Sequence, residues 1–205
     1  MASHYRKITQ ALNFLAARCG QGGRLNRMKA IKLLYFTDRY HLRKYGRSVT
    51  DDQYVAMTWG SVGSLAKDIC EDSAFLDEET KRYAERFISP DGQYEYHSVG
   101  GVDEQVFSET DREALDFSVK HFAKLDQFEL ADLTHAYPEW KKHERQVTEA
   151  GTSVPMAYED FFGDPADDDP ILQRLCPNGD VFREVSDPAA REAYEEARKR
   201  ERLWD

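Results

Sequence analysis

"MKAIKLLYFTDRYHLRKYGRSVTDDQYVAMTWGSVGSLAKDI", residues 28–69, contains the patterns that decide the fold. Apolar side chains recur every three or four residues over its first half, which predicts a helix with two different faces. Asn26 is a suitable N-cap for this helix, and Gly46 stands where a C′ glycine ends one. Beyond an acidic link, side chains alternate over residues 54–59 at the period of a β-strand. The stretch therefore predicts a long helix followed by a strand.

Helical patterns also dominate the rest of the chain. Further helices are predicted over residues 8–15, 64–71, 77–87, 108–122, 126–134, 153–163 and 187–203. The clearest start signals are two capping boxes, Ser108 with Asp111 and Asp126 with Glu129. A turn at Pro90-Asp91-Gly92 between two β-prone segments predicts a hairpin. Because strands and helices do not alternate regularly, we predict a mainly α (α+β) fold, a helical domain with a small antiparallel β-sheet.

The best candidate for a domain boundary lies in the last third of the chain. Residues 163–170, "GDPADDDP", are acidic and flanked by proline, as linkers often are. The helix that follows is highly charged and has few apolar positions. We therefore expect residues 1–150 to form the main domain, and residues 151–205 to be an acidic linker and a charged C-terminal helix appended to it.

Composition limits the class of protein. The chain has 205 residues, 40% of them hydrophobic, which is typical of a globular protein. No apolar run approaches the ~20 residues needed to cross a bilayer, and the first residues do not resemble a secretory signal. The three cysteines are far apart in sequence, which favours reduced thiols over disulfides or a zinc site. We expect a soluble, cytoplasmic protein.

The net charge of −10 is unevenly distributed. The segment Arg24–Arg47 contains eight basic residues and one acid, Asp38, so the rest of the chain carries −17. One interpretation is that the basic segment is a solvated helix face, paired with acids of the same chain. The other is that it binds an acidic partner surface or a phosphate backbone. The sequence favours the first.

Patterns typical of enzymes are missing from the sequence. We find no phosphate-binding glycine loop, zinc-protease helix or serine nucleophile elbow. Asp38 and His41 lie one turn apart on the long helix, where we expect a local pair of polar side chains. A hydrolase built on Asp38, His41 and His135 is the enzymatic alternative. We predict no catalytic residues, no cofactor and no metal site.

Residues 130–144, "LADLTHAYPEWKKHE", combine residue types that could serve either chemistry or structure. Pro138 ends the preceding helix, so Thr134 and His135 fall at a helix C-terminus. Trp140 follows the corner, where it can cover helix ends while its indole N–H finds an acceptor. Because no nucleophile or ligand spacing accompanies these residues, we favour a structural corner over an active site.

Taken together, these stretches resemble the Panacea domain of SocA-like antitoxins from bacteria and phages. The first half matches at Lys32, Leu33, Leu34, Tyr35, Phe36, His41, Leu42, Tyr45, Gly46, Trp59 and Gly60. The second half matches in "FSETDREALDFSVKHF" and "ELADLTH", and the signature includes Thr134, His135 and Trp140. The resemblance covers about residues 5–145. Gly60-Ser61 stands where the family usually has Gly-Pro. We expect these signature residues to be structural.

The resemblance implies a non-enzymatic antitoxin that neutralises a cognate toxin, encoded nearby, by direct binding. One branch of the family delivers its toxin to a ClpXP-type protease, and such an adaptor is the first alternative. The second is a nucleic-acid-binding regulator using the Arg24–Arg47 helix, although the acidic remainder opposes approach to a duplex. As candidate toxin contacts we select, by charge and expected exposure, Lys32, Arg39, Arg43, Tyr194 and Trp204.

Overall fold

The central element of the computed structural model, which describes residues 4–203, is α2 (Arg27–Tyr45). Its ends are the predicted ones: the Asn26 side chain accepts a hydrogen bond from the Lys29 amide, and Gly46 is left-handed with φ 72°. Every residue from Ala30 to Arg43 is buried, so the helix has no solvated face. The predicted solvation of the basic face is wrong, because neighbours cover α2 on all sides.

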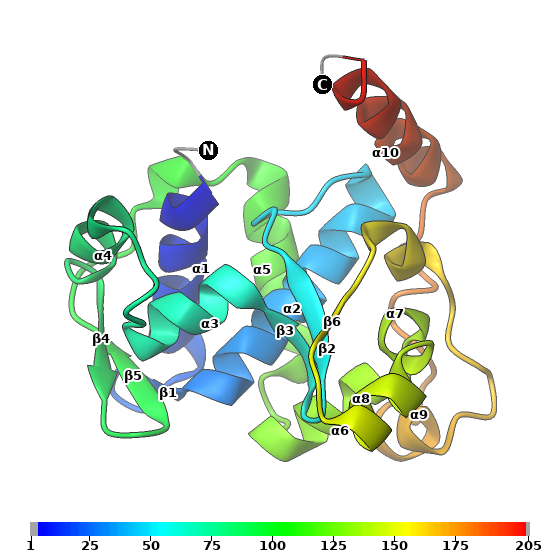
Figure 1. The fold of residues 1–205 in the computed structure, drawn as a ribbon, viewed down its shortest axis with the longest axis horizontal. Helices are drawn as coiled ribbons and strands as arrows, with labels where there is room; N and C mark the ends of the chain where they lie inside the picture. The colour runs from blue at the N-terminus through cyan, green and yellow to red at the C-terminus, as the bar shows by residue number, and fades with distance from the viewer. Residues whose placement is uncertain (1–3, 204–205) are drawn as a thin grey trace.

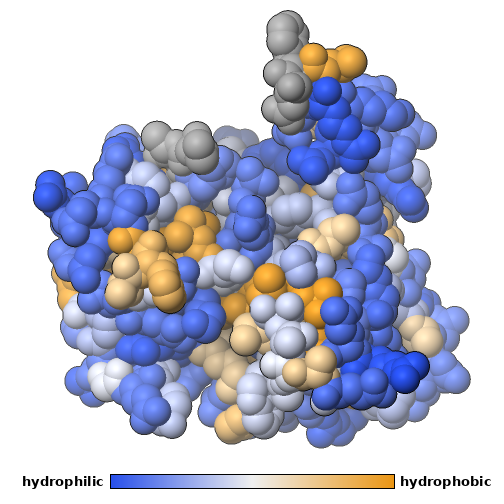
Figure 2. Space-filling view, in the orientation of Figure 1, coloured by the Kyte–Doolittle hydropathy of each residue, from blue (hydrophilic) through white to orange (hydrophobic). Residues whose placement is uncertain are grey.

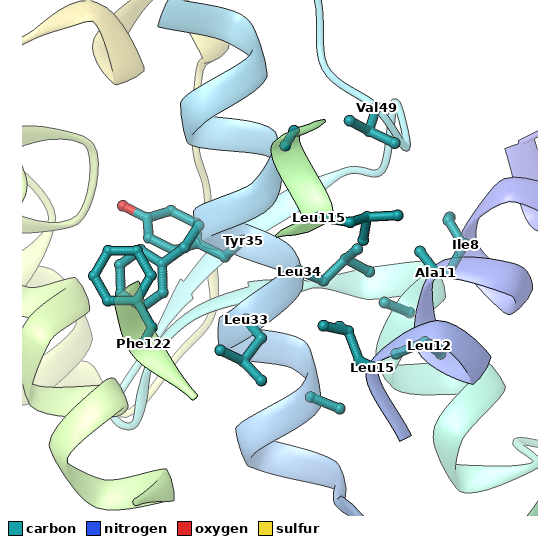
Figure 3. Packing of buried hydrophobic residues seen from close by; sticks show 14 of the residues in the cluster. Ile8, Ala11, Leu12, Leu15, Leu33, Leu34, Tyr35, Val49, Leu115 and Phe122 are labelled. Atoms are coloured by element: carbon teal, nitrogen blue, oxygen red, sulfur yellow. The ribbon is translucent and has the colours of Figure 1, made fainter. Parts of the chain in front are cut away.

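The helices that pack on α2 include α1 (His4–Cys19), α5 (Glu109–Phe122) and α6 (Gln127–His135). Figure 3 shows Leu34 of α2, Leu15 of α1 and Leu115 of α5 pointing toward one another. All three are at most 1% exposed. Both predicted capping boxes are confirmed, at the start of α5 and of α6. The core is therefore built around α2, and the local signals that start its neighbours were correctly predicted.

Within the described residues, six short strands form two antiparallel sheets of three strands each. The first contains β1 (Arg24–Asn26), β4 (Ile88–Asp91) and β5 (Glu95–Ser98) in the order β1-β5-β4. The second contains β2 (Tyr54–Met57), β3 (Gly60–Gly63) and β6 (Val154–Pro155) in the order β3-β2-β6. The predicted hairpin is β4–β5, and the predicted strand over residues 54–59 ends at Met57. The mainly α (α+β) class is confirmed, with two small sheets instead of one.

Shorter helices complete the fold: α3 (Ser64–Glu71), α4 (Glu78–Ala84), η1 (Glu104–Val106), α7 (Pro138–Lys141), α8 (Glu144–Ala150), η2 (Tyr158–Phe162), α9 (Pro170–Leu175) and α10 (Pro188–Glu201). α3 spans the predicted residues, but its cap is not Ser64. The Asp52 carboxylate accepts hydrogen bonds from the Leu65 and Ala66 amides, 2.9 Å each. Within residues 4–203, no helix is long and apolar enough to span a bilayer.

The segment after residue 150 packs into the same hydrophobic core. Phe161 and Phe182 are wholly buried within it, and Leu172 of α9 is 6% exposed. α10 lies beside the C-terminal end of α2 at one edge of the molecule (Figure 1). One hydrophobic core contains residues from both sides of residue 150. The placing of a domain boundary there stays a prediction.

Candidate functional site

The residues selected as exposed toxin contacts are mostly buried. Lys32, Arg39 and Arg43 are at most 2% exposed, and Tyr194 is 8% exposed. Trp204 lies outside the described residues. The expected exposure is therefore wrong for the first four, because neighbouring elements cover α2 completely and the Tyr194 ring packs against Phe162.

Arg39 and Arg43 hold the C-terminal segment against α2. The Arg39 guanidinium bonds the buried Glu139 carboxylate and donates to the Phe161 carbonyl at 3.0 Å. Arg43 donates to the Gly163 carbonyl at 2.8 Å and to the Asp164 carboxylate at 2.5 Å. Burial raises the pKa of Glu139, an effect that Arg39 opposes. Such buried charges are tolerated because they are paired and hydrogen-bonded. Both arginines act as internal anchors.

All eight basic side chains of the segment Arg24–Arg47 have partners within the chain. Five of its side chains pair with acids of the chain: Arg24 with Asp91, Arg39 with Glu139, Arg43 with Asp164, Lys44 with Glu113 and Arg47 with Asp111. The other three donate to backbone carbonyls: Arg27 to residues 92, 93 and 95, Lys29 to Ala123 and Lys32 to Ser61. The predicted pairing with acids of the same chain is confirmed for five of these residues, whereas the predicted solvated helix face is not found.

Asp38 and His41 do not form the predicted pair. The Asp38 carboxylate accepts hydrogen bonds from the amides of Val49 and Thr50 and from the Tyr54 hydroxyl. His41 bonds the Arg47 carbonyl through Nδ1 at 2.7 Å and the Thr110 hydroxyl through Nε2 at 3.0 Å. Both side chains are wholly buried and fully used in fixing the loop after α2. Neither is positioned beside His135 or a common cavity.

The signature residues of the two halves meet at the β2–β3 turn. Gly60 has a φ of 86°, and a Cβ there would lie 2.0 Å from the Thr134 hydroxyl oxygen. The Ser61 amide donates to that hydroxyl at 3.2 Å. Glycine is required here both for the left-handed backbone and for the close approach of the turn to α6. Signature positions 74 residues apart in sequence therefore form one contact.

The corner at residues 130–144 supports the same turn. The rings of His135 and Trp140 stack, with centroids 3.8 Å apart, and the Trp140 indole donates to the Met57 carbonyl at 3.0 Å. Burial lowers the pKa of His135 to about 4, so the ring is neutral at physiological pH. These contacts are those expected of a structural corner, and they fix the end of the β2–β3 hairpin.

Lys32 lies beneath this turn without an acidic partner. Its ammonium donates to the Ser61 carbonyl at 2.7 Å, and among residues 4–203 no carboxylate lies within ion-pair distance. Burial lowers the pKa of Lys32 to about 7. A buried lysine is normally paired, because desolvation of an unpaired ammonium is costly. An unpaired one beside a cavity is a candidate for binding.

That cavity is a pocket of about 840 Å³ between α2, the β2–β3 turn, α3, the β4–β5 hairpin and the start of α6. Its lining includes Lys32 and three exposed aromatic residues, Trp59 (61%), Tyr94 (65%) and Phe128 (52%). The rings of Trp59 and Phe128 are in contact, with centroids 6.0 Å apart. Figure 2 shows the surface hollowed between the β4–β5 hairpin and α6, with pale and orange side chains beside the hollow. We call this the aromatic pocket.

Sequence reasoning found part of the aromatic pocket. Lys32, Trp59 and the nearby Gly60 and Thr134 were singled out, whereas Tyr94 and Phe128 were not. Phe128 falls at an apolar position of α6, and only its place in the first turn, next to the Asp126 cap, hints at exposure. Tyr94 lies in the hairpin turn just before β5. A large aromatic residue in a predicted turn is the sequence signal that could have indicated its exposure.

Comparison with known families agrees with this convergence of signature residues. The model of the family described as antitoxin SocA-like, Panacea domain, matches residues 31–141, more than half of the chain. Neither a curated protein nor a solved structure matches this chain significantly. In the described part of the chain, His, Cys, Asp and Glu do not form a group of three suited to a metal ion. The chain therefore belongs to the SocA-like antitoxin family, with residues 31–141 as its Panacea domain.

Proposed function

We propose that this protein is an antitoxin that neutralises a cognate toxin protein by binding it directly in the aromatic pocket. The observation that carries the proposal is the exposure of Trp59, Tyr94 and Phe128 around one cavity within the family-matched region. Large exposed aromatic groups in a cluster mark interaction sites, because their burial on binding is a main source of affinity.

The set of toxin contacts changes accordingly. Lys32 stays in it as part of the pocket, and Trp59, Tyr94 and Phe128 join it. Arg39, Arg43 and Tyr194 act indirectly, by holding the C-terminal segment in place. Trp204, which lies outside the described residues, stays proposed as a second toxin contact. The acidic body around the pocket favours rapid encounter with a basic toxin.

The alternatives differ in how the structure supports them. A nucleic-acid-binding regulator is disfavoured, because each of the eight cations of Arg24–Arg47 is ion-paired or hydrogen-bonded within the chain, so binding phosphates would require breaking these interactions. A protease adaptor also has to bind the toxin, so it shares the aromatic pocket and differs only in the toxin's fate. We place this activity in the cytoplasm, with a toxin encoded beside the antitoxin in a bacterial or phage genome.

The test is co-expression with the protein encoded next to this one, scored by growth and by co-purification. Wild type should restore growth and form a stable complex, whereas Trp59→Ala combined with Phe128→Ala should weaken binding at least about tenfold. Phe75→Ala is the matched control, because Phe75 is 91% exposed and lies outside the pocket.

Each outcome has a clear meaning. If the double variant neutralises the toxin as well as wild type, the pocket is not the binding site. If growth is restored while the toxin is degraded, and this requires a ClpXP-type protease, the adaptor alternative is correct. If the neighbour is harmless and does not bind, the proposed function is wrong.

A further inference from the structure

Lys32 gives the aromatic pocket a chemical preference. Its side chain is almost completely buried, yet its ammonium has one hydrogen bond, to the Ser61 carbonyl, out of the three it can donate. Among the described residues no acid neutralises it. The pocket therefore contains a buried lysine for which residues 4–203 supply no anionic partner.

The other charged residues that line the pocket do not supply that counterpart. Glu71 is already paired with Lys67, at 2.7 Å. Arg27 donates to backbone carbonyls of residues 92, 93 and 95, so its positive charge is not neutralised by a carboxylate there. In a protein with a net charge of −10, this pocket is locally positive. Charge complementarity therefore points to an anionic group from outside.

We propose that the toxin inserts an Asp or Glu side chain, flanked by apolar residues, between the aromatic residues of the pocket so that its carboxylate pairs with Lys32. This inference rests on the proposed function and specifies the chemistry of the partner. The apolar flanks would cover Trp59, Tyr94 and Phe128, whose exposed rings would be buried in the complex.

A side chain fits better than the other carriers of negative charge. The last residues of a protein would bring a terminal carboxylate together with peptide groups, and these would lose hydrogen bonds to water in an apolar pocket. A phosphate group needs several donors, whereas the ammonium of Lys32 is the one cation of the lining buried enough to exclude water. The methylene groups of Asp or Glu are apolar and carry only the carboxylate to Lys32.

Proton uptake provides an independent signature. Since burial lowers the pKa of Lys32 to about 7, a fraction of the free protein carries a neutral amine at neutral pH and most of it does above that. A carboxylate next to the amine stabilises the charged form and raises its pKa. Binding at about pH 8 should therefore take up close to one proton from solution.

The experiment is calorimetry of toxin binding at about pH 8 in two buffers of different ionisation enthalpy. Wild type should take up close to one proton, whereas Lys32→Met should take up none and bind at least about tenfold more weakly. Lys29→Met is the matched control, since Lys29 lies on the same helix, donates to the Ala123 carbonyl and does not line the pocket. It should bind and take up protons as wild type does.

A charge-neutralising scan of the toxin, Asp→Asn and Glu→Gln, completes the test and does not depend on the folding of any Lys32 variant. One position should weaken binding to wild type at least about tenfold, without further loss in the Lys32→Met background. A complex that Lys32→Met forms with unchanged affinity and proton uptake would overturn this inference alone. The inference would also be overturned if binding weakened only when the toxin's C-terminal residue was removed, and not in any Asp→Asn or Glu→Gln variant. If wild type binds no neighbouring protein, the proposed function fails and the inference with it.

Discussion

Gly60 and Thr134 are packed so closely that a side-chain carbon on the glycine would lie 2.0 Å from the threonine hydroxyl oxygen. This contact joins the β2–β3 turn to α6 directly above Lys32, whose ammonium is bonded to the next carbonyl in the turn. The turn also carries Trp59, so the geometry of the aromatic pocket depends on the contact between these two residues.

We expect Gly60→Ala to destabilise the protein by roughly 2–4 kcal/mol, because it adds a steric clash to a left-handed backbone. Gly92→Ala is the control: it has a φ of 65° but open space around its Cβ, so it should cost only about 1 kcal/mol. Chemical denaturation measures both. Adding Thr134→Ala to Gly60→Ala should recover part of the loss. Equal costs at the two glycines would contradict the importance of the contact.

Replacing Lys32 by Met should stabilise the free protein at neutral pH, because it removes a buried, unpaired ammonium. The folded-state pKa of about 7 lies below the ordinary value of 10.5, so the unfolded chain binds more protons between these values. Wild-type stability therefore rises with pH in this window, and the advantage of the variant should shrink above pH 7 by roughly 1.4 kcal/mol per pH unit. Denaturant midpoints at about pH 6 and about pH 9 provide the check. A variant less stable than wild type at about pH 7 would mean that Lys32 is primarily structural.

Arg43→Met should loosen the segment around Gly163. The variant leaves the Ser186 hydroxyl without its donor and the Phe161 and Gly163 carbonyls with the Arg39 donor alone, which we expect to cost roughly 1–3 kcal/mol. Limited proteolysis should then cleave within residues 163–169 much faster than in wild type. Arg191→Met is the control, since its exposed pair with Glu195 should contribute less than about 1 kcal/mol. Unchanged cleavage in Arg43→Met would contradict the anchoring role.

His41 should make the fold sensitive to acid. The Arg47 carbonyl can only accept, so Nδ1 carries the proton and Nε2 accepts from Thr110. Burial lowers the pKa of His41 to about 4, whereas the unfolded value is about 6.5, so its contribution to stability is lost as pH falls from 6.5 to 4. Lys7, Arg47 and Asp111 are the charged groups that face the ring, and they oppose one another.

The measurement compares wild type with His41→Gln across that pH range. His41→Gln should be less stable at pH 7 but should have a shallower dependence on pH, by up to one proton. Asp38 and Asp52, whose pKa values burial raises to about 6, change stability in the opposite direction, but they do so in both proteins. Identical slopes in the two proteins would show that the pKa of His41 is the same in the folded and unfolded states, and would contradict the lowered value.

Features determined by local hydrogen bonds were predictable from the sequence. The caps of α2 and the boxes at Ser108 and Asp126 each involve residues within four positions, and all were found. The burial of α2 was not predictable in this way. It depends on partners such as Glu139, which is 100 residues away from Arg39 and shows no local pattern that would identify it. Charge on a helix therefore suggested a solvated face where the structure has buried ion pairs.

The aromatic pocket shows the same limit. Its residues come from five separate segments, around Lys32, Trp59, Lys67, Tyr94 and Phe128, and only the first three belong to the stretch that decided the fold. The family resemblance identified the residues that shape the β2–β3 turn, because these occur in order along the chain. The exposure of the aromatic rim is a property of the folded surface, which neither periodicity nor motif spacing describes.

The burial of Phe161 and Phe182 has a consequence for how this antitoxin can evolve. A recombination event that exchanged only the Panacea domain would leave behind the two rings that fill its interior, and the transferred domain would have a cavity in its core. Inheritance must therefore transmit the chain as a unit at least as far as Phe182. Adaptation to a new toxin is easier by substitutions around the pocket than by shuffling the segments that follow it.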